Sequence, residues 1–340
     1  MKKYVMEHPA MAVIGIVILF YSSIAMGDEV SGFDFLNLTS GAKYAGIAGC
    51  DFGTTGEVSA VFTNPAALQI TPKAFGFGYS RYFEGIQSGY GVFAMPKYKG
   101  TVGIGIKYLN YGTFDGTLEG YTPDDTISNR FNFEAQSMVS TIGYSRVVGE
   151  KAFGVSAKAI YYNLAGFTGT AVAIDAGGTI AIKKYEGLTI GAVLHNVGVQ
   201  TSKFDTASES LPFSASIGGN YLLFNKTALL SAQIKLPVKD TSVAKTLLSR
   251  IDKAVGIEWS ATPSFIIRGG YNSSGKELDT GTGSLKEVIT GLTFGIGIKT
   301  KVFILDYAIV PMGAIGVVNH ISFSRSIPDS KHKKADKQVG

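Results

Sequence analysis

The residues of this chain that could do chemistry are few, and the nearest approach to a catalytic group is His320-Ile321-Ser322. Residues two apart on a strand share a face, so this histidine and serine could exchange a hydrogen bond as base and nucleophile. A working triad also needs an Asn or Asp that orients the histidine, and none is evident here. Ser324 and Ser326 would lie on the same face, so ordinary polarity explains the pair. We expect no catalytic residue.

Metal and cofactor sites are no better indicated. The chain has four histidines and one cysteine, and their spacing matches no pattern of metal ligands. The glycine pairs lack the strand and helix that surround a phosphate-binding loop. We therefore expect a protein that is not an enzyme and that carries neither a cofactor nor a metal.

Charged residues recur instead inside segments that alternate between apolar and polar positions. Glu258 and Arg268 flank the tight turn Thr262-Pro263, so a hairpin folded there places them opposite each other on the polar face. Opposite charges across two strands contribute about 0.2–1 kcal/mol. The simpler interpretation is a structural pair that holds the strand register or an N-terminal plug segment inside the fold. A polar constriction on a ligand route is the alternative.

Five further charges fall on the polar positions of their segments: Lys107, Lys158, Asp175, Lys235 and Asp306. A lysine that faced lipid at the middle of a membrane would cost roughly 2–4 kcal/mol. We therefore predict that these side chains face the lumen of a barrel. Because both signs are present, this lining does not suggest selection for ions of one charge.

The segments that position these charges are about ten residues long and alternate strictly. In one of them, Phe213, Ala215, Ile217 and Tyr221 alternate with Ser214, Ser216 and Asn220. Successive side chains of a strand point to opposite faces, so each segment has one apolar and one polar face. We predict that Phe213, Ala215, Ile217 and Tyr221 contact lipid.

The composition agrees with strands that cross a membrane. Hydrophobic residues make up 45% of the chain and charged residues only 17%, below the usual quarter for soluble proteins. No segment after the first thirty residues is apolar for the length that a membrane helix needs. The net charge of +5 does not indicate nucleic-acid binding, because no basic patch interleaves with aromatic residues.

Turn signals divide the chain into about fourteen strands whose connections alternate between short and long. The short ones lie at 96–100, 149–151, 184–187, 225–226, 262–263 and 300, and most of the longer ones at 110–130, 200–210, 237–252, 273–287 and 311–318. An even strand number, short periplasmic turns and long extracellular loops are typical of outer-membrane barrels. We predict an all-β fold, a transmembrane antiparallel β-barrel of about 14 strands with both ends in the periplasm.

The two ends of the chain differ from this pattern. Residues 1–27 have the basic start, apolar core and small-residue cleavage site of a signal peptide, so we expect Sec export, cleavage near Gly27 and location in the outer membrane. Residues 28–72 are irregular and too long for a linker, and a wide barrel leaves a lumen to fill. We predict an N-terminal plug, or hatch, at 28–72, the barrel at 73–328 and a charged periplasmic tail at 329–340.

The proposed plug ends with Asn64-Pro65-Ala66. Proline restrains the residue before it to extended or turn geometry, and Asn can satisfy local backbone groups. We expect the tripeptide to lock the hatch before the first strand. The rival interpretation is a loose periplasmic arm, with Asn64-Pro65 marking only the start of a strand.

Asn64-Pro65-Ala66 resembles the hatch of FadL-type transporters of hydrophobic compounds. Further motifs resemble, in order, the PorV/PorQ family of FadL-like outer-membrane β-barrel proteins: Asp175-Ala176-Gly177, His195-Asn196-Val197-Gly198, Gly256-Ile257-Glu258-Trp259, Arg268-Gly269-Gly270-Tyr271 and Asp306-Tyr307-Ala308. The resemblance implies a fourteen-stranded barrel with a plugged lumen. For FadL relatives it implies passive movement of hydrophobic molecules, and for PorV a role in type IX secretion.

Two functions therefore stay open: passive transport of hydrophobic small molecules, and a non-enzymatic secretion component that binds or shuttles secreted proteins. The expected partners are outer-membrane lipid, the barrel-assembly machinery, and either a hydrophobic ligand or secretion-system proteins. The last strand ends at Ile327 rather than on a terminal aromatic residue, which departs from the usual signal for barrel assembly. The loops at 110–130, 237–252 and 272–287 lack clustered aromatics, so the sequence does not decide between the two functions.

Overall fold

The computed structural model describes residues 32–50, 52, 55–69, 72–117, 130–202, 209–237, 251–278 and 289–327. The predicted signal peptide at 1–27 and the predicted tail at 329–340 lie outside these residues. Among the described residues, no helix is both long and apolar enough to cross a membrane.

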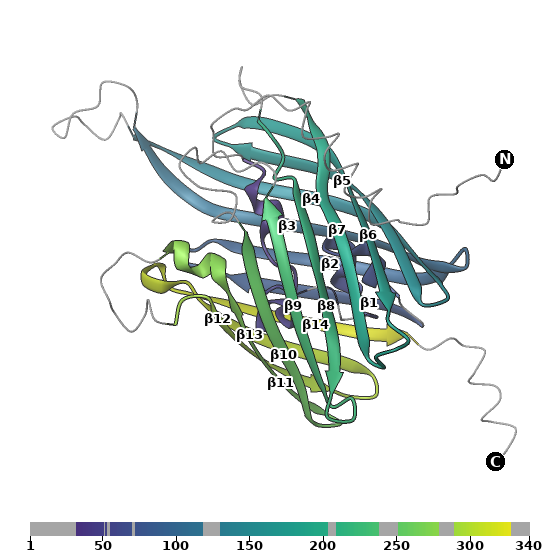
Figure 1. Ribbon diagram of the computed structural model, residues 1–340. Helices are drawn as coiled ribbons and strands as arrows, with labels where there is room; N and C mark the ends of the chain where they lie inside the picture. The colour runs from purple at the N-terminus through teal and green to yellow at the C-terminus, as the bar shows by residue number, and fades with distance from the viewer. Residues whose placement is uncertain are drawn as a thin grey trace, which may run out of the picture.

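The described residues form fourteen strands in one closed antiparallel barrel (Figure 1). In chain order they are β1 (Lys73–Arg81), β2 (Gln87–Lys97), β3 (Gly100–Thr117), β4 (Arg130–Val148), β5 (Lys151–Leu164), β6 (Phe167–Ala181), β7 (Leu188–Ser202), β8 (Ser214–Leu223), β9 (Ala228–Pro237), β10 (Asp252–Thr262), β11 (Phe265–Asn272), β12 (Leu292–Lys299), β13 (Phe303–Pro311) and β14 (Val317–Ile327). Each strand pairs with its neighbours in sequence, and β1 pairs with β14 to close the ring. The predicted barrel is confirmed.

Alternation along each strand separates the two faces of the wall. In β3, Ile104 and Ile106 are about half exposed, whereas Lys107 is 3% exposed. The same contrast separates Ile217 from Ser216 in β8. Apolar side chains therefore cover the outside of the barrel and polar ones turn inward, the reverse of a soluble sandwich.

The predicted lipid contact of Phe213 is wrong. Phe213 precedes the first residue of β8 and is buried, and its backbone N–H donates to the carbonyl of Leu211. Leu211 packs into an apolar cluster inside the barrel. Because the chain turns inward before the strand ladder begins, the alternation that places Ile217 outward does not extend to Phe213.

The connections at one rim are short, which follows from the turn-forming residues there. The β2–β3 turn consists of Tyr98 and Lys99, both with positive φ, as a two-residue hairpin that matches strand twist requires. The β4–β5 turn contains Gly149 at φ 61°. We call this end of the barrel the short-turn rim, and the opposite end the long-loop rim.

The segment before β1 lies inside the ring of strands, where Figure 1 draws it in purple. It contains four short helical turns: η1 (Asp34–Asn37), α2 (Ala42–Gly46), η2 (Val58–Phe62) and η3 (Pro65–Ala67). Phe33, Tyr44, Val61 and Leu68 are almost fully buried. The described residues between 32 and 69 are named the interior segment below.

Candidate functional site

The tripeptide Asn64-Pro65-Ala66 packs against the inner wall at β5 and β6. Asn64 is fully buried, and its Oδ1 accepts a hydrogen bond from the Ala66 N–H at 3.1 Å. A Cβ added at Gly154 would overlap the backbone of Pro65 and Ala66, and one at Gly177 would stand 2.5 Å from Asn64 Oδ1. These two glycines let the interior segment approach the wall at backbone distance.

Arg268 is the centre of a charge cluster on the inner wall. Its Nε lies 2.7 Å from Glu258 Oε2, and its Nη1 lies 2.8 Å from Asp306 Oδ1. Glu258 and Arg268 lie on the two strands of the predicted hairpin, and a register shift between Ser260 and Thr262 beside the turn makes them direct partners. Lys43 of α2 extends the cluster to the interior segment, because its Nζ lies 3.9 Å from Glu258 Oε2.

The link from Arg268 to Asp306 was not predicted from the sequence. Asp306 belongs to β13, and β12 lies between the two residues. A Cβ at Gly297 of β12 would stand 2.5 Å from Asp306 Oδ1 and 2.8 Å from Arg268 Nη1. The missing side chain at Gly297 therefore opens the space in which the ion pair forms. In the sequence, the glycines that alternate with larger residues along β12 were the signal that could have indicated this space.

A second buried pair joins β5 to β6. Lys158 Nζ lies 2.6 Å from Asp175 Oδ2 and donates to Asn196 Oδ1 at 2.8 Å. The backbone N–H of Asn196 donates to Asp175 Oδ1, also at 2.8 Å. Asn196 has φ 56° and occupies an irregularity in the β6–β7 register opposite Asp175. The predicted inward charges thus meet, and Asn196 is a partner that sequence reasoning missed.

Two lysines hold the interior segment from different parts of the wall. Lys107 Nζ of β3 donates to the carbonyl of Leu38 at 2.6 Å, and Lys235 Nζ of β9 donates to Asn37 Oδ1 at 2.9 Å. Neighbouring residues of the segment are therefore attached to strands on different sides of the lumen.

His320 and Ser322 both face inward but have different partners. His320 Nδ1 lies 2.7 Å from Ser80 Oγ on β1, whereas Ser322 Oγ accepts a hydrogen bond from the Ala42 N–H at 3.2 Å. The serine therefore holds the interior segment. The described residues contain no group of three or more His, Cys, Asp or Glu that could hold a metal ion.

The interior changes character along the barrel. Toward the long-loop rim, an apolar cluster joins the interior segment to the wall: Phe33, Phe35, Leu109, Val139, Ile160, Tyr162, Ala171, Ala173 and Leu211. The rings of Phe33 and Tyr162 meet edge to face with centroids 5.0 Å apart. We name this cluster the apolar chamber.

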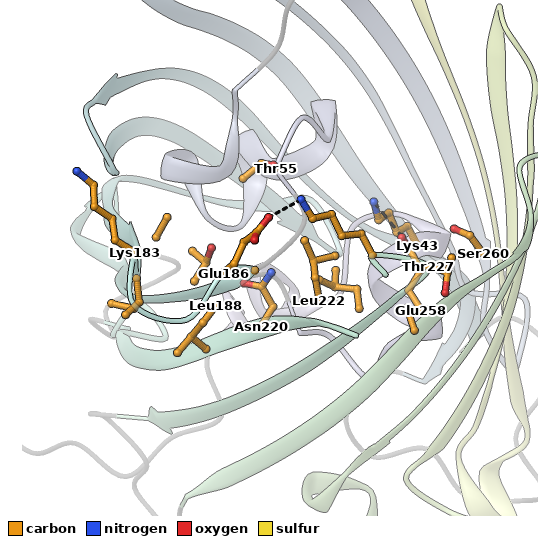
Figure 2. Close-up of a pocket in the computed structure, with 17 residues that line it drawn as sticks. Lys43, Thr55, Lys183, Glu186, Leu188, Asn220, Leu222, Thr227, Glu258 and Ser260 are labelled. Carbon is orange, nitrogen blue, oxygen red and sulfur yellow. Dashed lines mark hydrogen bonds and ion pairs between the residues drawn. The ribbon is translucent and has the colours of Figure 1, made fainter. Parts of the chain in front are cut away.

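Toward the short-turn rim, the lumen contains a pocket of about 480 Å³ (Figure 2). Its apolar lining includes Leu188, Leu222 and Leu229, and its polar lining includes Lys43 and Glu258. The ion pair of Glu186 and Lys226, 2.7 Å long, joins the β6–β7 and β8–β9 turns at the border of this pocket. A partly apolar space thus reaches the end of the barrel opposite the apolar chamber.

Comparison with known proteins identifies the class of fold. No protein-family model and no curated protein matches the sequence. The solved structure of the toluene transporter TbuX of Ralstonia pickettii superposes with a TM-score of 0.57 at 14% identity, covering 85% of this chain and 99% of that one. The CymD monoaromatic hydrocarbon channel gives 0.56 at 11% identity, covering 88% and 99%.

The TodX deltaS2S3 mutant, also a monoaromatic hydrocarbon channel, gives a TM-score of 0.58 at 13% identity, covering 85% of this chain and 99% of that one. At such identities the likeness concerns the fold. The chain shares the fold of these structures, a closed transmembrane barrel, and the FadL-like resemblance of its motifs stays a prediction. Assignment to the PorV/PorQ family stays a prediction.

Proposed function

We propose that this protein is an outer-membrane channel that passes small hydrophobic molecules by passive diffusion. The observation that carries the proposal is the apolar chamber toward the long-loop rim, with a partly apolar pocket at the opposite end of the lumen. Burying apolar surface contributes roughly 25 cal/mol per Å², so an apolar solute gains free energy when it leaves water for contact with these packed side chains. The fold shared with structures named as hydrocarbon channels supports this reading.

The proposed location follows from the two faces and the two rims. The apolar outer face requires a bilayer, and a barrel with short turns at one rim normally places those turns in the periplasm. The long-loop rim, with the apolar chamber beneath it, then faces the outside of the cell. A solute would enter there and leave through the pocket near the short-turn rim.

In this proposal the interior segment acts as a plug. It contributes Phe33 to the apolar chamber and Lys43 to the pocket lining. It is held by Lys107, Lys235 and the contact of Pro65 with Gly154. Passage requires a part of this segment to shift. The comparisons lend no support to the secretion alternative, which stays a prediction from the resemblance.

The test of substrate class is uptake by cells of a host strain that lacks its own hydrocarbon channel. Expression of this protein should accelerate uptake of toluene and leave uptake of arabinose unchanged. Ile160→Asn, in the apolar chamber, should reduce toluene uptake about ten-fold, since a buried polar group disfavours an apolar solute. Equal acceleration of both solutes, or of neither, would contradict the proposal.

The test of the plug is deletion of residues 33–61. The shortened chain should insert into liposomes and make them permeable to small sugars in a swelling assay, whereas the intact chain should leave them tight. A shortened barrel that inserts normally and stays tight would show that the segment does not close the lumen.

A further inference from the structure

Five cations lie on the outer face of the barrel at the short-turn rim, all on one side. They are Lys73 of β1, Lys97 of β2, Arg146 of β4, Lys151 of β5 and Arg325 of β14, and all five are exposed. Because β14 pairs with β1 and the chain continues through β2, β3, β4 and β5, these strands form one continuous panel. We name these five residues the basic panel.

On each strand, the cation of the basic panel is an even number of residues from the lipid-facing side chains, so it lies on the same outer face. Two positions farther from the rim, the same strands carry Phe75 (β1), Met95 (β2), Tyr144 (β4), Phe153 (β5) and Phe323 (β14). Phe75 is the register partner of both Phe93 and Arg325, and its ring lies 6.2 Å from that of Phe323. An aromatic girdle of this kind marks the depth of the membrane–water interface in β-barrels.

The charges of the basic panel have no carboxylate partner within the described residues, although Lys97 Nζ lies 4.9 Å from the ring centroid of its neighbour Tyr98. None of the five forms an ion pair there. Glu150 and Glu186, in the turns of this rim, are already bonded to Lys183 and Lys226. The outer face near the same rim on β7 to β12 is apolar instead, with Ile190, Tyr221, Leu230, Trp259, Phe265 and Ile298.

We propose that the basic panel binds the phosphate groups of anionic phospholipids in the leaflet at the short-turn rim. Long cationic side chains that start beside an aromatic girdle reach the headgroup layer while their stems stay on apolar surface. Each Lys or Arg near an anionic membrane surface favours association. The panel faces sideways into the bilayer, where lipid is the neighbour and a soluble acidic protein has no access.

The spacing also favours headgroups over a single free anion. Adjacent strands are about 4.8 Å apart, so cations spread over β14 to β5 cover the width of several lipids and converge on no single point. The proposal does not depend on what passes through the lumen, because the panel and the apolar chamber lie on opposite faces of the wall.

The test is the lipid retained by the full-length protein when native mass spectrometry releases it from nanodiscs of equal phosphatidylglycerol and phosphatidylcholine. The wild-type protein should retain more phosphatidylglycerol, and Arg146→Gln combined with Lys151→Gln should reduce that preference at least about three-fold. The preference should weaken when ionic strength rises from about 0.02 M to about 0.3 M, because salt screens exposed charges. Absence of a preference in the wild-type protein would overturn the proposal.

The matched control removes two outward cations at the long-loop rim, Arg81→Gln with Lys253→Gln, both exposed. It should keep the preference, as should the charge-conserving pair Arg146→Lys with Lys151→Arg. Heat-modifiable migration on gels shows that each variant is folded. Equal loss in both Gln pairs would mean that net charge alone selects the lipid. Loss of the preference on adding inorganic phosphate at constant ionic strength would assign the panel to a free anion. Either result would refute the phospholipid site.

Discussion

Arg268 shows how single residues hold this interior together. Its side chain is 1% exposed and bonds two carboxylates that come from two other strands. Charges removed from water stabilise a fold only when each has a partner of good geometry, and removing one partner leaves the others buried and unpaired. The cluster is therefore a strong determinant of the local structure of β10 to β13, whatever its part in transport.

Replacing Arg268 by Ala should destabilise the folded barrel by about 3–5 kcal/mol, since Asp306 keeps its charge without a partner. The measurement is denaturant unfolding of the refolded protein in detergent, followed by tryptophan fluorescence. Lys299→Ala, which removes one cation from the exposed end of β12, is the control and should cost far less. Similar losses in both variants would show that the cluster contributes little.

At the scale of elements, the two faces of a strand must respond differently to charge. Ile217 of β8 is 59% exposed and faces lipid, whereas Thr189 of the paired strand β7 lines the pocket. Ile217→Arg should lower the stability of the inserted barrel by about 2–4 kcal/mol if it lies near mid-depth. Thr189→Arg should cost less, because the pocket has room and water for the guanidinium. Folding into vesicles at increasing urea measures both, and equal costs would reverse the assignment of faces.

The turns of the short-turn rim are linked by an exposed ion pair that responds to pH. The hydrogen bond and charge of Lys226 hold the pKa of Glu186 below its ordinary value of 4.5. A lowered pKa means that the link is complete above the ordinary value and is lost as pH falls through the lower one. The connection between the β6–β7 and β8–β9 turns should thus loosen only in acid.

Spin labels at Tyr185→Cys and Asn225→Cys, in a Cys50→Ala background, measure this effect. The distribution of distances between the labels should broaden as pH falls below 4.5. In Glu186→Gln it should be broad at every pH. A wild-type distribution that is already as broad as that of the variant at neutral pH would show that the ion pair does not restrain the turns.

At the scale of the whole molecule, glycines in the wall let the interior segment pack against the barrel at backbone distance. Gly154→Ala places a methyl group against the backbone of Pro65 and Ala66, where nothing flexible can yield. We expect the barrel to fold with its interior segment displaced, so that liposomes become leaky and the segment becomes sensitive to protease. Gly178→Ala meets only ordinary contacts at 3.8 Å and should stay tight. Two variants that behave alike would show that the close approach is not what seats the segment.

Much of the wall was predictable because strands alternate with a period of two and turns have strong residue preferences. The alternation alone placed Lys107, Lys158 and Asp175 inward. The tight turn predicted at 262–263 brought Glu258 and Arg268 onto facing strands, and a register shift between Ser260 and Thr262 makes them direct partners. The prediction for Phe213 was wrong because this residue lies before β8, where the two-residue alternation of a strand does not apply.

The contacts between residues far apart in the sequence were set only by the closed barrel. Arg268 reaches Asp306 across a strand, Asp175 meets the bulge at Asn196, and Asn64 rests on β6 more than a hundred residues later. Such contacts depend on the register of several strands and on ring closure, which no local pattern encodes. The basic panel likewise exists because β14 returns beside β1. Within the strands, the sequence by itself thus determined which way side chains point, and the tertiary structure decided which of them meet.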